Sequence, residues 1–302
     1  MKYFLKDDFS YEAVVYPEPV HYLDNGKWVD VDNTLEETKD DSVVTEETTS
    51  DVTSSESKSI VSTGEAAIAA DTTEETIDNA ANKAEKVKDS KNVLKNKQND
   101  YNVNFAKNSK SNKLVNIQKD NYSISWSIEG AEKTKAEAIA ADITAVDNTI
   151  KAETEEKVEK SEEFKEFSTA QKAKAKETII DNENKKLAPK STSMLQYKGI
   201  LPDVDLKYSV GSAKLKEDII VNKYSKDFKI TFNIDSKGLS ARLEKDNTIS
   251  FYDEKDPSKV IFNTAPPFMY DKNGESSNKV QVKLDKDKKG YKLTLIPDDT
   301  WM

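Results

Sequence analysis

Residues 191–221, with the sequence STSMLQYKGILPDVDLKYSVGSAKLKEDIIV, decide the fold of this chain. The stretch packs several short β-prone runs around two turns centred on Gly199 and Gly211. Residues 222–302 continue in the same style, whereas residues 36–189 mostly do not. The chain is therefore predicted to be mainly β, built as an antiparallel β-sandwich or an open barrel.

Short strands follow one another at regular intervals from residue 191 onwards. Turn sequences rich in Gly, Asn, Asp and Pro separate most of them. This spacing is typical of sandwiches and barrels. The predicted strands are Met194–Tyr197, Leu206–Val210, Leu215–Val221, Phe228–Ile234, Leu239–Leu243, Thr248–Tyr252, Val260–Phe262, Phe268–Tyr270, Val280–Leu284 and Tyr291–Ile296.

Two segments nearer the N-terminus carry the same β signals. The Asp-Asn-Gly sequence at residues 24–26 predicts the turn of a β-hairpin. The strict alternation of apolar and polar residues over Tyr122–Ile128 predicts a half-buried strand. Residues 1–35 and 99–130 are therefore predicted to be N-terminal strands that join the sheets formed by residues 191–302, the C-terminal β domain.

Polar insertions separate these β regions. Residues 36–98 begin with a Ser-, Thr-, Asp- and Glu-rich stretch that predicts disorder, followed by a helical pattern over Thr72–Lys97. Residues 131–190 are rich in Ala, Glu and Lys, and their first 56 residues, Ala131–Lys186, contain neither Gly nor Pro. This second insertion is predicted to be helical, with a coiled coil as the alternative.

The composition limits the classes of partner. The chain has 302 residues, of which 35% are hydrophobic and 34% charged, and its net charge is -10. Acidic and basic residues are interspersed, which disfavours nucleic acid and anionic lipid as partners. No membrane span is expected, because no apolar run reaches about 18 residues. No signal peptide is recognised at the N-terminus, and the chain is interpreted as a fragment of a longer protein.

Cysteine is absent from the chain. Disulfides, thiolate nucleophiles, cysteine-ligated zinc and iron–sulfur clusters are therefore excluded. The eight glycines are scattered singly among turns, so a glycine-rich phosphate loop is not expected either.

Residues able to carry acid–base chemistry are few or unremarkable in their spacing. His21 is the only histidine and is interpreted as a structural or surface residue. Paired carboxylates could serve a glycosidase, which needs two carboxyl groups about 5–9.5 Å apart. With 56 acidic residues such pairs arise by chance, so these are interpreted as solvent-facing. The pairs are Asp30 and Asp32, Asp203 and Asp205, and Asp298 and Asp299.

Three further groups of residues have some features of functional sites. The loop Asp271–Glu275 lacks the ligands of a calcium loop and is predicted to be a hairpin turn. Lys216 and Glu217 are adjacent in a strand, so one of them is expected to face inward and to need an ion-pair partner. The aromatic residues in the alternating runs are assigned to the core, with a sugar-binding platform as the alternative. They are Tyr22, Trp28, Tyr122, Trp126, Tyr197, Tyr208, Tyr252, Phe268 and Tyr270.

Short motifs occur in a distinctive order along the chain: Pro19–Tyr22, Gly26–Trp28, Asp32–Leu35, Tyr197, Leu201–Tyr208, Leu215–Ile220, Ala265–Asp271, Tyr291–Asp298 and Trp301. Together they resemble the N-terminal region of large exported proteins of Gram-positive bacteria. These are wall-associated or polymorphic-toxin-like proteins that carry DNRLRE segments and RHS (YD) repeats. The resemblance covers Tyr3–Leu35, Tyr101–Gly130 and Ser191–Met302.

The resemblance implies a non-enzymatic, β-rich scaffold segment of an extracellular or cell-wall-associated protein. Its expected partners are other domains of a larger surface protein or cell-wall glycans, without nucleic acid and without a membrane span. No catalytic, cofactor-binding or metal-binding residue is predicted, and no cofactor. The alternatives are a carbohydrate- or cell-wall-binding β-sandwich module and a glycoside-active enzyme.

Overall fold

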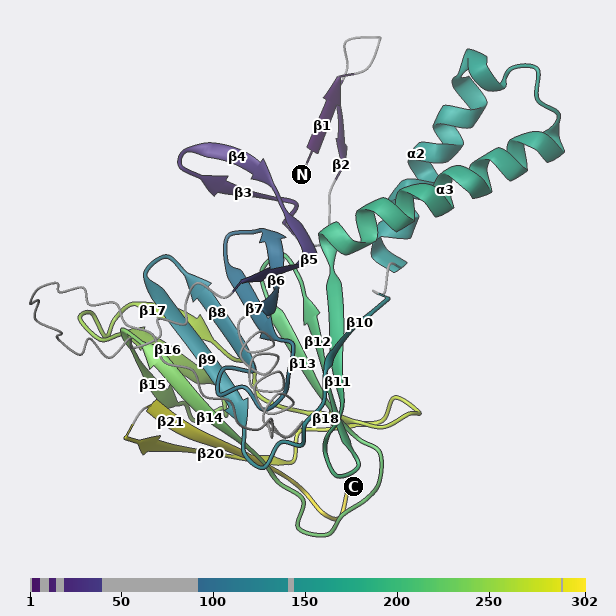
Figure 1. Cartoon of the computed structure of the whole chain (residues 1–302). Coiled ribbons are helices and arrows are strands. Elements are labelled where there is room, and N and C mark those ends of the chain that lie inside the picture. The colour runs from purple at the N-terminus through teal and green to yellow at the C-terminus, as the bar shows by residue number, and fades with distance from the viewer. Residues whose placement is uncertain (1, 6–10, 15–18, 40–91, 141–143, 289) are drawn as a thin grey trace, which may run out of the picture.

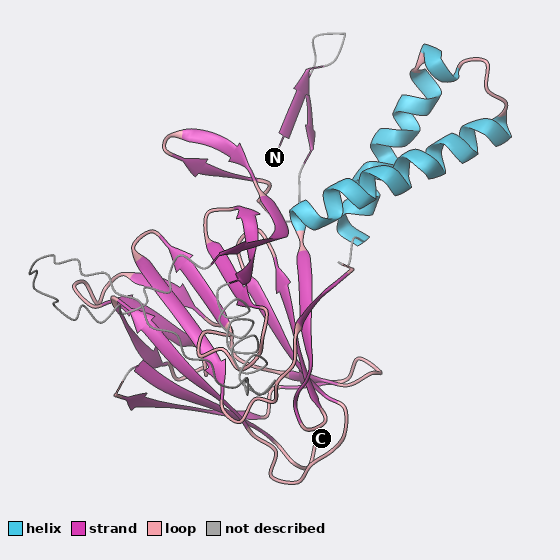
Figure 2. Ribbon diagram, in the orientation of Figure 1, coloured by secondary structure: helices cyan, strands magenta, loops and turns pink. Residues whose placement is uncertain are grey.

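A computed structural model describes residues 2–5, 11–14, 19–39, 92–140, 144–288 and 290–302. About half of these residues lie in strands of antiparallel β-sheets, which confirms the predicted mainly β fold (Figure 1). Each of the ten strands predicted after residue 191 has a counterpart in the structure. The described residues also include two long helices, which stand away from the sheets (Figure 2).

The largest sheet has eight strands and draws them from both ends of the chain. All its neighbouring strands are antiparallel. Residues 99–130 thus join a sheet formed after residue 191, as predicted, but of the described residues up to residue 35 only those from Asp32 onwards do, because the earlier strands form separate hairpins. In spatial order the strands are β20 (Val280–Asp287), β21 (Gly290–Pro297), β14 (Ile230–Lys237), β9 (Tyr122–Ile128), β8 (Val115–Lys119), β7 (Asn102–Ala106), β6 (Asn92–Gln98) and β5 (Asp32–Lys39).

Two smaller sheets and three hairpins complete the β structure of the described residues. The four-stranded sheet consists of β10 (Ala136–Ile139), β11 (Ser193–Leu201), β12 (Val204–Val210) and β13 (Leu215–Val221), in that order. The three-stranded sheet consists of β15 (Leu239–Leu243), β16 (Ile249–Asp253) and β17 (Val260–Asn263). The hairpins pair β1 (Lys2–Leu5) with β2 (Tyr11–Val14), β3 (His21–Asp24) with β4 (Lys27–Asp30), and β18 (Met269–Tyr270) with β19 (Ser276–Ser277).

The four-stranded sheet packs against the eight-stranded sheet across an apolar core. Alternate residues of β12 are buried, and Tyr208 has no solvent exposure. The ring of Tyr208 lies 5.4 Å from that of Phe105 on β7 and 6.4 Å from that of Trp126 on β9, measured between centroids. Fully burying a large apolar side chain contributes about 1.5–3 kcal/mol. The buried side chains of β12 alternate along the strand, so one face of it packs against the eight-stranded sheet.

The helices form a hairpin of their own, α2 (Thr144–Lys160) and α3 (Thr169–Ser191), with the short 3₁₀ helix η1 (Glu162–Phe164) in the connection. The apolar side chains of Val158 and Phe164 are buried in it. Glu159 of α2 pairs with two lysines of α3, at 3.2 and 2.8 Å. Helix was predicted for this Ala/Glu/Lys-rich segment, but its first part also contains strand β10, which pairs with β11.

The other insertion differs from its prediction at both ends. Asn92–Gln98, the end of the predicted helix over Thr72–Lys97, is strand β6, and β5 extends to Lys39. Val93 and Asn96 are buried in the sheet, so pairing with β5 and β7 prevails over the helical spacing of the sequence. The predicted disorder and the rest of that helix, residues 40–91, lie outside the described residues.

Candidate functional site

The β3–β4 hairpin presents a pocket at the surface of the molecule. Its turn places Asn25 at φ 47° and Gly26 at φ 79°, the left-handed pair that a tight two-residue hairpin turn requires. The register pairs Leu23 with Trp28 and His21 with Asp30. Because directly paired residues share a face, these four side chains project from one face of the hairpin. The hairpin predicted at residues 24–26 is therefore confirmed.

The pocket has a volume of about 370 Å³ and is lined by Pro19, Val20, His21 and Trp28. His21 Nε2 lies 2.8 Å from Asp30 Oδ1. A carboxylate in this position fixes the orientation of an imidazole ring and selects which nitrogen carries the proton. Trp28 is 74% exposed, so its indole face is open to a planar ligand. The hairpin stands off from the main sheets (Figure 1).

A second cluster lies inside the sandwich. Glu217 on β13 is paired with Tyr208 on β12, so its side chain points to the inner face of the four-stranded sheet. The Tyr208 hydroxyl donates a hydrogen bond to Glu217 Oε1 and accepts one from Trp126 Nε1 at 3.2 Å. Burial raises the pKa of the Glu217 carboxyl to about 7, against the opposing effect of the Tyr208 hydrogen bond. Burial also raises the pKa of Tyr208, and the nearby Glu217 adds to the rise.

The opposite face of the same strand carries an ion-pair network. Lys216 Nζ lies 2.9 Å from Asp218 Oδ1, and Lys207 Nζ lies 3.5 Å from Asp218 Oδ2. Tyr270 donates to Asp218 Oδ1 at 3.1 Å. The expected inward-facing member of the Lys216–Glu217 pair is thus Glu217, but its partner is a tyrosine hydroxyl rather than a cation. The ion pairing occurs outside, where the lysines remain partly solvated.

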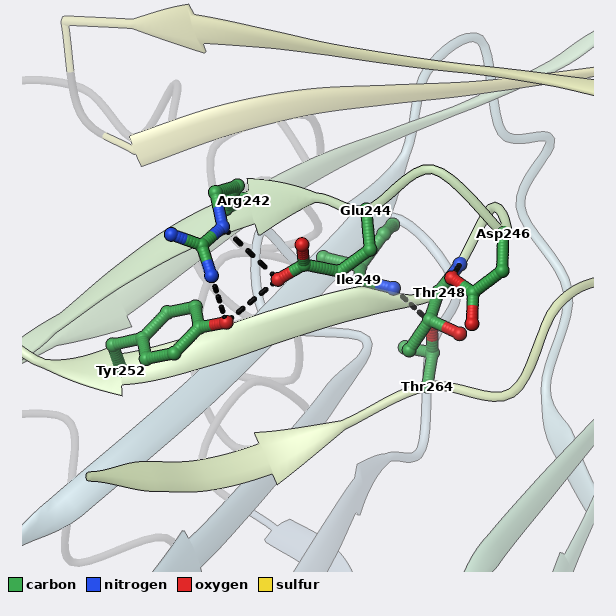
Figure 3. Close-up of polar contacts among 7 residues, drawn as sticks. All are labelled: Arg242, Glu244, Asp246, Thr248, Ile249, Tyr252 and Thr264. Carbon is green, nitrogen blue, oxygen red and sulfur yellow. Dashed lines mark hydrogen bonds and ion pairs between the residues drawn. The ribbon is translucent and has the colours of Figure 1, made fainter. Parts of the chain in front are cut away.

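Figure 3 shows a third polar cluster, on the β15–β16 hairpin. Arg242, the only arginine of the chain, places Nε 3.0 Å from Glu244 Oε1, and Tyr252 donates to the same oxygen at 2.6 Å. The guanidinium also contacts the Tyr252 hydroxyl and lies over its ring, 4.5 Å from the centroid. Hydrogen bonds from Tyr252 and Arg242 lower the pKa of Glu244. Since each group already has a partner within the cluster, it braces the hairpin.

The carboxylate pairs considered for glycosidase chemistry brace turns instead. Asp205 accepts the amide of Gly199 at 2.6 Å and the side-chain amide of Asn222 at 3.0 Å. Asp203 lies in the β11–β12 turn at φ 58°. In the other two pairs, three of the four carboxylates also accept backbone amides. Asp32 accepts the amide of Thr34, Asp298 that of Thr300 and Asp299 that of Asp227. The fourth, Asp30, contacts His21.

The loop Asp271–Glu275 is the turn between β18 and β19, as predicted. Asp271 Oδ1 accepts the amides of Asn273 and Glu275 at 2.8 and 3.0 Å. Within the described part of the chain, no group of three or more His, Cys, Asp or Glu side chains is arranged to hold a metal ion.

The aromatic residues divide between core and surface. Tyr197 and Tyr208 are fully buried, as predicted. Three others assigned to the core are exposed: Trp28 at 74%, Phe268 at 60% and Tyr270 at 52%. All three lie in two-stranded hairpins or next to them, and Tyr270 contacts the four-stranded sheet at the outer face that carries Asp218. The sequence predicted the strands correctly but not which faces would be covered.

Comparison with known proteins finds partial relatives. Three curated proteins match this chain at 33% identity over 131 residues, 38% of this chain and 6% of each relative. They are tRNA nuclease WapA of Bacillus subtilis strain 168, tRNA3(Ser)-specific nuclease WapA of Bacillus spizizenii and tRNA(Glu)-specific nuclease WapA of Bacillus subtilis subsp. natto. The chain thus spans a small part of these relatives. No protein-family model matches it, and no solved structure does.

These findings correct the functional interpretation of the sequence. The resemblance to DNRLRE and RHS (YD-repeat) proteins is overturned, because no family model matches and the relatives are named as tRNA nucleases. The same names overturn the predictions of a non-enzymatic scaffold and of a chain without enzymatic activity. They also weigh against the exclusion of nucleic acid as a partner, which stays a prediction. Among the described residues, no helix is long and apolar enough to cross a membrane.

Proposed function

We propose that this chain takes part in the cleavage of tRNA. The observation that carries the proposal is its 33% identity over 131 residues to three proteins named as tRNA nucleases. The matched segment is 6% of each relative, so the activity and the substrate both belong to the proposal.

Within the described residues, the β3–β4 hairpin has the groups best suited to contact RNA. Unpaired bases stack on exposed aromatic side chains, and the Trp28 indole is open to solvent. An imidazole held by a carboxylate can accept the proton of a ribose 2′-hydroxyl, and His21 is held by Asp30. The net charge of -10 offers no general attraction for phosphate, so binding would depend on stacking and local contacts.

The test is a cleavage assay with the purified full chain and bulk tRNA, in which fragments are resolved on a denaturing gel. Cleavage that falls about 100-fold in His21→Gln would support acid–base chemistry at this residue. If cleavage is unchanged in His21→Gln, the proposed function is supported but another residue must act as the acid or base. If the chain neither cleaves tRNA nor binds it more tightly than an unrelated RNA, the proposed function is wrong.

A matched pair of variants tests the hairpin as the contact. Trp28→Ala removes the exposed indole, whereas Phe268→Ala removes an aromatic ring of similar exposure far along the chain. Loss of a stacking contact weakens binding by about 1–3 kcal/mol, roughly 5- to 150-fold. We expect this loss of tRNA affinity in Trp28→Ala and none in Phe268→Ala. Equal effects would show that the hairpin is not the site.

The location and the remaining partners are part of the same proposal. We propose a location outside the cell or in the cell wall, with other domains of a larger surface protein or cell-wall glycans as contacts. The exposed Trp28 supports a glycan contact, because an open aromatic face suits a sugar ring as well as a base. Cell fractionation with an antibody to the chain and co-sedimentation with purified peptidoglycan test these points.

The domain boundaries at residues 35, 98, 130 and 190 also stay a proposal. Strands of residues 99–130 and 191–302 lie in one sheet, which supports grouping these two regions, whereas β5 runs across residue 35 and β6 belongs to the same sheet although it lies within residues 36–98. Limited proteolysis followed by mass spectrometry would place the first cuts within the two insertions.

A further inference from the structure

Strand β13 occupies the edge of the four-stranded sheet and contains an acid that faces the core. Its only strand neighbour among the described residues is β12. Glu217 is half-buried as a residue because the strand edge is open, but its carboxylate contacts Tyr208, which has no solvent exposure. A carboxylate in such a position loses water contacts that its ionised form needs.

The described residues around this carboxylate supply hydrogen bonds but no positive charge. The titratable groups on its side are Tyr208 from β12 and, beyond it, Tyr197 from β11, whose ring lies 6.3 Å from that of Tyr208. The eight-stranded sheet presents Trp126, which does not titrate. The nearby charged groups of its own sheet, Asp218 with Lys207 and Lys216, lie on the opposite face. Among the described residues, Glu217 therefore forms no ion pair.

We propose that Glu217 makes edge strand β13 a pH-dependent element of the fold, held in the sandwich while its carboxyl group is protonated and released as the group ionises. The proposal rests on the geometry of the cluster: an inward-facing acid on an edge strand, hydrogen-bonded to a buried phenol and without a counter-charge from any described residue. It is independent of tRNA cleavage and of the β3–β4 hairpin.

The direction of the effect follows from linkage. Burial raises the pKa of Glu217 in the folded protein to about 7, above its usual value in an unfolded chain. The folded state therefore binds this proton more tightly. The stabilisation is complete below pH about 4.3, the unfolded value, and is lost as the pH rises to about 7.

Amide hydrogen exchange measured at pH 5 and at pH 8 tests the proposal, with the rates converted to protection factors to remove the intrinsic effect of pH. In the unmodified chain, protection of the β13 amides and of their β12 partners is expected to fall at least about tenfold between the two pH values. In Glu217→Gln, which keeps the acceptor for the Tyr208 hydroxyl but cannot ionise, protection is expected to remain level. The control is Glu137→Gln, an exposed carboxylate in the same sheet whose pKa is lowered by Lys198, and it should behave like the unmodified chain.

Two results would overturn the proposal. The first is equal protection of the β13 amides at pH 5 and pH 8 in the unmodified chain. This test needs no variant, so it can be made even if Glu217→Gln does not fold. A tenfold fall that persists in a folded Glu217→Gln variant would assign the effect to another group.

Discussion

Tyr208 and Trp28 show how two aromatic residues with similar sequence surroundings reach opposite environments. Both lie in short strands next to polar residues, and both were assigned to the core. Tyr208 is fully buried and Trp28 is 74% exposed. The difference lies in the covering layer: β12 faces a second sheet, whereas no sheet of the described residues covers the face of the β3–β4 hairpin that carries Trp28. Alternation therefore indicates which residues share a face, and tertiary packing decides whether that face is covered.

The largest loss of stability is expected when the buried residue of this pair, Tyr208, is replaced. Tyr208→Asp would place a charge among Phe105, Trp126 and Tyr197 without a cation to pair with it. Burying an unpaired charge and losing the ring should cost more than about 4 kcal/mol, enough to unfold a marginally stable domain. Circular dichroism and a urea titration would detect the loss of structure. A cooperative transition at the unmodified midpoint would contradict the burial of this ring.

The parts of the fold that were predictable are those governed by local pattern. The turn at residues 24–26 and the strand Tyr122–Ile128 follow from residue type and spacing alone, and both are present. Strand β6 was missed although β7 follows it directly, because its other partner, β5, lies far away in the sequence. Local spacing there favoured a helix, so tertiary pairing decided the outcome.

The contacts of the candidate sites also differ in whether local sequence or tertiary packing determines them. The contact of His21 with Asp30 could have been found from the sequence, because a two-residue turn at Asn25 and Gly26 fixes the register that pairs them. The tyrosine partner of Glu217 also follows from a register, but only once β12 and β13 are known to be neighbours. That no described residue supplies a cation to the Glu217 carboxylate depends on which side chains occupy the opposing sheet.

A smaller loss of stability is expected when the buried polar contact between β5 and the turns of the sandwich is removed. Asn99 donates to Asn33 Oδ1 at 2.8 Å and to the Gly211 carbonyl at 3.2 Å, and Asn33 is completely buried. Asn99→Ala removes the donor to buried Asn33 Oδ1, whereas the Gly211 carbonyl still accepts from the Tyr101 hydroxyl; the loss of one buried partner costs about 1–3 kcal/mol. The urea midpoint should fall with an unchanged slope. As a control, Asn273→Ala in an exposed turn should change the midpoint much less.

The next largest effect is expected in how the free energy of unfolding of Glu217→Gln depends on pH, compared with that of the unmodified chain. Because burial raises the pKa of Glu217 to about 7, the unmodified chain loses stability as the pH rises from about 4.3 to 7, and the variant does not. For a half-exposed residue we expect the free energies of unfolding to differ by about 1–2 kcal/mol between pH 5 and pH 8. Urea titrations of both proteins at the two pH values measure it. If the free energy of unfolding changes equally with pH in the two proteins, the Glu217 carboxylate is exposed to solvent in the folded state.

The smallest stability effect is expected at Trp28, and it gives the sharpest test of the comparison. Trp28→Ala removes a side chain whose surface is mostly in water already, so the free energy of unfolding should change by less than about 0.5 kcal/mol. A buried aromatic residue replaced by alanine costs about 3–5 kcal/mol, as expected for Phe105→Ala in the core. If Trp28→Ala instead lowers the urea midpoint as much as Phe105→Ala does, the hairpin packs on another part of the fold. A stable variant that has lost affinity for tRNA would show that this exposed ring is used for binding.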